Sequence, residues 1–208
     1  MAVDGTSIRI SRGRVRRPRV PTLASVALLS LLSACAWGGS DRGGHPDSGF
    51  VTSGDGIDRV EEAHRMKAPR LTGETLQGRK IDLGAYKGKV IVLNVWGSWC
   101  TPCRAEAPHL AKVAKDLKAD GVEFVGINTR NRDKTEPLKF EKDYGVSYPS
   151  FYDPYGKLLL EFPKGSLNPQ LIPSTIVIDR QGGIAARAMR ALNEDQLRNV
   201  LRPLVEER

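Results

Sequence analysis

The stretch KVIVLNVWGSWCTPC, residues 89–103, joins an apolar run to a Cys-x-x-Cys motif. The run over 89–96 is nearly continuous, which is typical of a strand buried on both faces of a parallel or mixed sheet. Beyond the motif, apolar residues recur at the spacing of one helix face, at Leu110, Val113, Ala114 and Leu117. The two cysteines are therefore expected where a buried strand runs into a helix.

This position gives Cys100 and Cys103 different chemical roles. The free N–H groups and the macrodipole at a helix N-terminus favour an anion, so the pKa of the Cys100 thiol is expected to lie below its usual value of about 8.5. Cys100 can then attack as a thiolate near neutral pH. Cys103 lies nearly one turn further into the helix, close enough to form a disulfide but less exposed, and is expected to be the resolving cysteine.

Two other kinds of site would also contain a Cys-x-x-Cys pair. A zinc site needs two more ligands, but His45 and His64 lie in or beside a polar spacer and His109 stands alone. A structural disulfide is possible outside the cytosol, although so small a ring restricts the unfolded chain little. The spacing and context favour a redox-active pair with no metal.

The first 34 residues are predicted to be a lipoprotein signal peptide. Six arginines precede residue 20, and an uncharged apolar run follows over 22–32 that is too short to span a bilayer. The run ends in Leu32-Ser33-Ala34-Cys35, which resembles the bacterial lipobox. We therefore expect cleavage before Cys35 and lipidation of Cys35, which would anchor the chain to the outer face of the cell membrane.

Two alternatives to this export route remain open. Cys35 could be a coincidental thiol in an ordinary signal peptide. The pair Arg16-Arg17 also raises the twin-arginine route, but Pro18 and Arg19 follow instead of the polar-then-apolar context of that signal. General secretion with lipidation is the favoured interpretation.

The net charge of +8 belongs mostly to the leader. Without its six arginines and one aspartate the rest of the chain carries +3. No stripe of lysine and arginine with interleaved aromatic residues is present, so the sequence does not support a nucleic-acid partner.

The remainder divides into a flexible tether over 35–60, rich in Gly, Ser and Asp, and one domain over 61–208. Within the domain we expect a hairpin over 68–83, a strand over 122–128, a helix over 134–144, a turn over 151–156, a hairpin over 174–188 and a helix over 193–206. This order predicts an α/β sheet with helices on both faces.

The segment from Asn94 to Pro108, which reads NVWGSWCTPCRAEAP, resembles the active-site segment of the TlpA/ResA-like family of extracytoplasmic thioredoxin-fold oxidoreductases. Ile172-Pro173-Ser174-Thr175 resembles the cis-proline loop of the same superfamily. The resemblance covers about residues 68–207. It implies a thioredoxin fold with a central mixed β-sheet flanked by helices, an N-terminal β-hairpin extension and a central helical insertion.

The resemblance also implies roles for individual residues. Pro173 would be cis and face the disulfide, which leaves the backbone of Ile172 free to pair with an extended substrate. Trp99, Thr101 and Pro102 would border the substrate surface.

Asn94 occupies the place of a buried acid in thioredoxin, and an amide cannot exchange protons with the inner cysteine. Glu106, one helical turn after Cys103, would then be the proton acceptor. The alternative for Glu106 is a solvent-facing glutamate in an ordinary helix.

The resemblance implies a thiol–disulfide oxidoreductase that works by mixed-disulfide exchange without a bound cofactor. Family resemblance favours reduction of disulfides in exported proteins, such as apocytochrome c during cytochrome c maturation, with electrons from a membrane thiol carrier. A general reductase or an oxidase of exported proteins remains open.

A peroxiredoxin-like peroxidase is disfavoured because the residues before Cys100 lack the Pro-x-x-x-Thr-x-x-Cys setting. A non-enzymatic lipoprotein with an inert disulfide is the remaining alternative.

Overall fold

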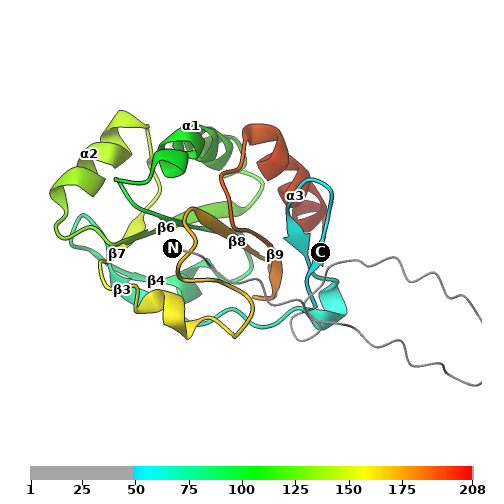
Figure 1. Cartoon of the computed structure of the whole chain (residues 1–208). Coiled ribbons are helices and arrows are strands. Elements are labelled where there is room, and N and C mark those ends of the chain that lie inside the picture. Colours follow the sequence, from blue (N-terminus) through cyan, green and yellow to red (C-terminus); the bar gives the residue numbers. More distant parts are fainter. Residues whose placement is uncertain (1–48, 208) are drawn as a thin grey trace, which may run out of the picture. The chain divides into compact units, whose positions relative to one another are not determined.

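The computed structural model describes residues 49–207, which build a seven-stranded sheet in the order β1-β2-β9-β8-β5-β6-β7 (Figure 1). The strands are β1 (Val51–Thr52), β2 (Asp58–Arg59), β5 (Val90–Trp96), β6 (Val122–Thr129), β7 (Ser150–Asp153), β8 (Ser174–Ile178) and β9 (Ile184–Ala188). β5, β6 and β7 are parallel, whereas β8 runs antiparallel to β5 and to β9. The carboxyl ends of β5, β6 and β7 therefore meet at one edge of the sheet.

All seven residues of β5 are buried, as expected for a strand with neighbours on both sides and layers on both faces. The predicted mixed sheet of a thioredoxin fold is confirmed. The cysteines follow β5 directly, so they lie at the edge where the parallel strands end.

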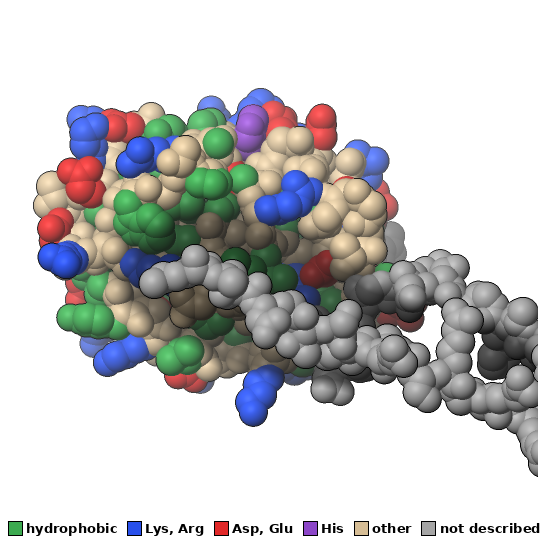
Figure 2. All heavy atoms as spheres, viewed as in Figure 1, with side chains coloured by type: hydrophobic (Ala, Val, Ile, Leu, Met, Phe, Trp, Pro, Cys, Tyr) green, Lys and Arg blue, Asp and Glu red, His purple; other side chains and the backbone are tan. Residues whose placement is uncertain are grey.

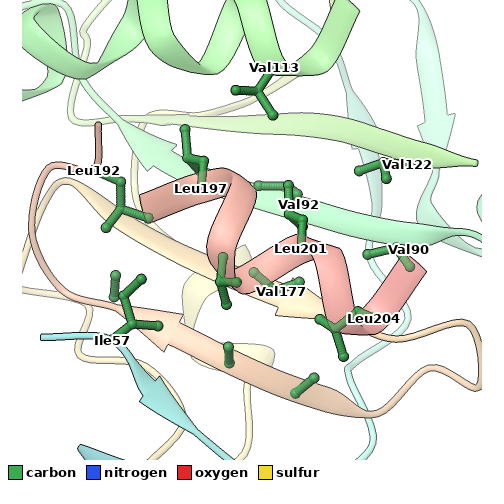
Figure 3. Close-up of a cluster of buried hydrophobic side chains, with 14 of the residues drawn as sticks. Ile57, Val90, Val92, Val113, Val122, Val177, Leu192, Leu197, Leu201 and Leu204 are labelled. Atoms are coloured by element: carbon green, nitrogen blue, oxygen red, sulfur yellow. The ribbon is translucent and has the colours of Figure 1, made fainter. Parts of the chain in front are cut away.

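Three α-helices complete the main elements: α1 (Thr101–Asp116), α2 (Thr135–Asp143) and α3 (Glu194–Glu206). α1 and α3 cover one face of the sheet, and Figure 3 shows Leu197 and Leu201 of α3 directed toward Val92 and Val177. α3 begins at a capping box in which Asn193 accepts from the Gln196 N–H, at 2.9 Å. The predicted helix over 193–206 is confirmed.

α2 is the predicted helical insertion and lies between β6 and β7 in the chain. Pro137 falls in its first turn, where the missing N–H costs no helical hydrogen bond. Phe140 of α2 stacks on Trp96 with ring centroids 4.4 Å apart. This contact ties the insertion to the end of β5, just before the cysteines.

The opposite face of the sheet is closed by the predicted hairpin and by short 3-10 helices. The hairpin consists of β3 (Thr72–Glu74) and β4 (Lys80–Asp82), and the 3-10 helices on this face are η2 (Leu83–Tyr86) and η3 (Leu158–Glu161). A further 3-10 helix, η1 (Glu62–His64), has no buried residue. Leu83 and Leu159 from these elements pack on Leu93 and Ile176 of the sheet. The expectation of helices on both faces is thus met on this side only by 3-10 helices.

Two sequence predictions differ from the structure. Residues 151–156 were expected to be a turn, but β7 pairs in parallel with β6 before the turn begins. The strand has only four residues and ends at Asp153, directly before Pro154, so the turn residues at its end hid the strand pattern in the sequence.

The predicted tether also extends too far. Residues 50–60 carry β1 and β2, and Phe50 and Ile57 are buried in the two core clusters. Arg187 of β9 lies over the Phe50 ring, 4.0 Å from its centroid, and pairs with Asp58 at 2.8 Å. Each strand has only two residues, too few to show a periodic pattern in the sequence. Pairing at the edge of the sheet stabilises them.

The predicted signal peptide, Cys35 and the tether up to residue 48 lie outside the described residues. Among residues 49–207, no helix combines the length and apolar character needed to cross a membrane.

Candidate active site

Cys100 and Cys103 form a disulfide with their Cα atoms 5.3 Å apart. Cys100 is the N-cap residue of α1, and its Sγ accepts a hydrogen bond from the Cys103 N–H at 3.2 Å. In this oxidised form both residues are buried, at 4% and 1% exposure. Exposure therefore hardly distinguishes the two sulfurs. The N–H groups at the start of α1 do distinguish them, because they favour a negative charge on the Cys100 sulfur.

The Ile172–Pro173 peptide bond is cis, as the resemblance implied. Ile172 packs against the cluster of Cys100, Cys103 and Ala107. Ser174, the residue after Pro173, donates its hydroxyl to the Leu171 carbonyl at 2.6 Å and so stabilises the turn. The loop thus lies beside the disulfide although it is about 70 residues away in sequence.

Glu106 is buried, with 1% of its surface exposed, so the alternative of a solvent-facing helix glutamate is wrong. Burial raises the pKa of Glu106 to about 7, and two hydrogen bonds oppose this shift in part. The Asn94 amide donates to Oε1 at 2.7 Å and the Leu192 N–H donates to Oε2 at 3.1 Å. Within residues 49–207 the carboxyl group bonds to these two donors, not to either cysteine.

Asn94 is the partner that holds Glu106 in place. Its Nδ2 also lies 3.3 Å from the Thr175 hydroxyl, next to the cis-proline loop. Asn94, which would correspond to the buried acid of thioredoxin, therefore orients the carboxyl group of Glu106 from α1. A carboxyl group with a pKa near 7 is suited to accept and return a proton at neutral pH.

The predicted substrate-surface residues surround the disulfide on the outer side. Trp99 is 48% exposed, whereas Thr101 and Pro102 form the exposed first turn of α1. A Cβ on Gly97 would lie 2.7 Å from the Trp99 Nε1, so only glycine allows this indole to fold back over the chain. Figure 2 shows hydrophobic side chains gathered below α1 on the face viewed.

Sequence reasoning missed a polar network beneath this turn. Asn131, which follows β6, accepts from the Ser98 N–H at 3.1 Å and donates to the Ser98 hydroxyl at 2.6 Å. Its position just after a buried parallel strand was the available signal, because the ends of such strands meet at one edge.

No group of three or more metal-binding side chains occurs among residues 49–207.

Comparison with known proteins agrees with this site. Residues 63–201 match the Redoxin family. The chain belongs to the Redoxin family. It is 32% identical over 139 residues to the thiol-disulfide oxidoreductase ResA of Bacillus subtilis, covering 65% of this chain and 74% of that protein. The predicted membership of the ResA-like thiol–disulfide oxidoreductases is confirmed, as is enzymatic activity of this class.

Two solved structures are similar over most of the domain. A DsbF homologue from Corynebacterium diphtheriae has 36% identity and a TM-score of 0.67, covering 73% of this chain and 95% of its own. A secreted thiol-disulfide isomerase from Corynebacterium glutamicum has 33% identity and a TM-score of 0.70, covering 79% and 96%. Both support the thioredoxin-like fold and redox chemistry at Cys100 and Cys103.

Proposed function

We propose that this protein reduces disulfides in exported proteins, and that its substrate is an apocytochrome c whose haem-binding cysteines have become oxidised. The observation that carries the disulfide-exchange chemistry is the placement of Cys100 at the N-terminus of α1, where the Cys103 N–H donates to its sulfur. The reductive direction rests on the resemblance to ResA. The ResA-like relatives and the secreted isomerase support a location outside the cytoplasm.

The proposed reaction begins with the reduced enzyme. The Cys100 thiolate attacks one sulfur of the substrate disulfide, and the other substrate sulfur leaves as a thiolate. Cys103 loses its proton, attacks the Cys100 sulfur of the mixed disulfide and releases the second substrate thiolate. Two electrons pass to the substrate, and the Cys100–Cys103 disulfide remains. No bound cofactor is needed, because the two cysteines carry the electrons.

Glu106 is proposed to accept the Cys103 proton. It follows Cys103 by three residues on α1, a spacing that places the two on one face of the helix. Its pKa of about 7 matches proton transfer at neutral pH. Trp99, Thr101, Pro102 and the backbone of Ile172 are proposed to hold an extended substrate segment, with Pro173 shaping the loop beside the disulfide.

The proposed location is the outer face of the cell membrane, with lipid on Cys35. The lipobox-like end of the leader supports it. A tether of this kind would hold the domain beside membrane-bound partners at high effective concentration. A membrane thiol carrier would return the electrons to the oxidised enzyme.

The test is deletion of the gene followed by haem staining of membrane proteins. We expect covalent c-type haem to be lost, restored by the intact gene or by an added thiol reductant, and not restored by Cys100→Ser. Normal c-type cytochromes in the deletion strain would reject the apocytochrome substrate. In that case, accumulation of other exported proteins in disulfide form would assign a general reductase.

A further inference from the structure

Two loops of the active site lie far apart in sequence but share a support. One is the turn over 97–99 that leads into Cys100, and the other is the segment over 166–172 that leads into Pro173. Arg130 and Asn131, at the end of β6, contact both. β6 lies next to β5 in the sheet, so this pair sits directly beside the cysteine turn.

Asn131 fixes the cysteine turn. It is 8% exposed, and both polar atoms of its side chain are used. Oδ1 accepts from the Ser98 N–H at 3.1 Å and from Asn128 Nδ2 at 3.0 Å, while Nδ2 donates to the Ser98 hydroxyl at 2.6 Å. The Asn131 carbonyl accepts from the Tyr152 hydroxyl at 3.2 Å, which ties this residue to β7.

Arg130 holds the second loop. Its Nη2 donates to the Pro169 carbonyl at 2.7 Å and to Gln170 Oε1 at 3.3 Å. Its backbone has a φ of 57°, the only positive φ at a non-glycine among residues 49–207. Left-handed backbone is unfavourable for a residue with a Cβ, and such residues cluster at functional sites. The left-handed backbone of Arg130 therefore lies where two successive side chains contact different loops: Arg130 contacts Pro169 and Asn131 contacts Ser98.

We propose that Arg130 and Asn131 are positioning residues that set the spacing between Cys100 and the cis-proline loop, beside which an extended protein substrate binds. The inference rests on the proposed disulfide exchange at Cys100. The two residues act differently. Asn131 holds the turn that presents the nucleophile, so it affects every disulfide substrate. Arg130 holds only the segment that leads into Pro173, so it affects substrates large enough to contact that loop.

The Arg130 side is tested with Arg130→Ala and Arg130→Gly, assayed on oxidised insulin and on glutathione disulfide. Both variants should raise the KM for insulin about threefold to tenfold, because both remove the hydrogen bonds of Arg130 to Pro169 and Gln170. The rate constant with glutathione disulfide should change less than about twofold, because that substrate is small. Arg130→Gly should melt at a higher temperature than Arg130→Ala, since glycine tolerates the positive φ.

The matched control is Arg132→Ala. Arg132 is an exposed arginine two positions away and makes no hydrogen bond or ion pair within the described part of the chain. The Arg132→Ala variant removes the same positive charge but leaves the contact of Arg130 with the loop intact. Its KM for insulin should therefore stay at the wild-type value. If the Arg130 and Arg132 variants raised the KM for insulin equally, the effect would come from the loss of positive charge. That result would overturn the positioning role of Arg130.

The Asn131 side is tested with Asn131→Ala, Ser98→Ala and the double variant. In the reduced protein, Asn131→Ala should slow iodoacetamide labelling of Cys100 about threefold to tenfold at pH 7. The midpoint of the pH profile of labelling should also shift to higher pH. Ser98→Ala should have a smaller effect, and the double variant should match Asn131→Ala because the two share a contact. Asn131→Asp keeps the acceptor for the Ser98 N–H and should restore part of the rate.

The outcomes separate this inference from the proposed function. A wild-type protein that exchanges no disulfide rejects both. An active wild type whose variants lose melting temperature but keep the labelling profile and insulin KM rejects only the positioning roles. A labelling effect in Asn131→Ala without an insulin effect in the Arg130 variants would overturn the claim that the two loops are set together.

Discussion

Two buried glutamates on neighbouring helices show why burial alone does not make a functional acid. Glu106 lies on α1 beneath the disulfide, and Glu141 lies on α2 beside the turn of the β3-β4 hairpin. Burial raises the pKa of both carboxyl groups, and an amide donates to each: Asn94 to Glu106 at 2.7 Å and Gln77 to Glu141 at 2.6 Å.

The difference lies in what surrounds each group. Glu106 also accepts the Leu192 N–H and shares a helix face with Cys103. Glu141 instead lies beside the Ser150 hydroxyl, which also opposes the rise of its pKa, and its helix carries no thiol. In the proposed mechanism, position relative to the thiols, not the pKa shift, distinguishes Glu106 from Glu141 as the proton acceptor.

The largest expected effect is on thiol exchange. Glu106→Gln should slow resolution of the mixed disulfide about a hundredfold, because an amide cannot take the Cys103 proton. Initial attack by Cys100 should change much less. Stopped-flow kinetics with a trapped mixed disulfide would measure both steps.

Glu141→Gln is the matched control, with the same chemical change in a second buried glutamate. Its resolution rate should equal that of the wild type. If both variants slow resolution alike, the comparison between the two glutamates fails and the effect is one of general stability.

The next effect is on stability. The folded protein holds the Glu106 proton more tightly than the unfolded chain does, because its pKa of about 7 exceeds the unfolded value near 4.5. Stability should therefore fall as pH rises from about 4.5 to about 7, by roughly 3 kcal/mol, and level off above. Glu106→Gln should remove this slope.

Urea unfolding of the oxidised protein between pH 4 and pH 9 would measure that dependence. Glu141→Gln should remove a slope of the same sign. Parallel curves for the wild type and Glu106→Gln would mean that Glu106 titrates normally in the folded protein.

The smallest effect concerns the amide partners. Asn94→Ala should raise the pKa of Glu106 further, because it removes a donor that favours the ionised form. The pH profile of resolution should then move upward by up to about one unit. Gln77→Ala should cost about 1 kcal/mol of stability and leave that profile in place. A shifted profile in Gln77→Ala would break the distinction between the two sites.

The local part of the site could be predicted from sequence, and the assembled part could not. The strand–Cys-x-x-Cys–helix junction is written in consecutive residues, and the cis bond before Pro173 followed from the family resemblance. The contact of Asn131 with Ser98 joins residues 33 apart, and that of Arg130 with Pro169 joins residues 39 apart. Their pairing depends on strand order in the sheet, which no local pattern specifies.

The fold shows the same limit. Long apolar runs such as 89–96 and 122–128 identified β5 and β6, because many residues carry the signal. The two-residue strands β1 and β2 were assigned to the tether, since β1 is held by pairing with β2, and β2 by pairing with β9 and by the Arg187–Asp58 ion pair. Glu106 was expected as proton acceptor with a surface alternative, and only its packing against Asn94 and Leu192 excluded the surface position.

The reduction potential of the Cys100–Cys103 couple tests the central claim most directly. The oxidised protein would be equilibrated with a dithiothreitol series and its thiols counted by mass after alkylation. A reversible two-electron transition nearer about −270 mV than about −120 mV is the predicted result, since the first value is that of a reductant and the second that of a strong oxidant. A bond that dithiothreitol does not open, or a potential near the oxidant value, would contradict a disulfide reductase.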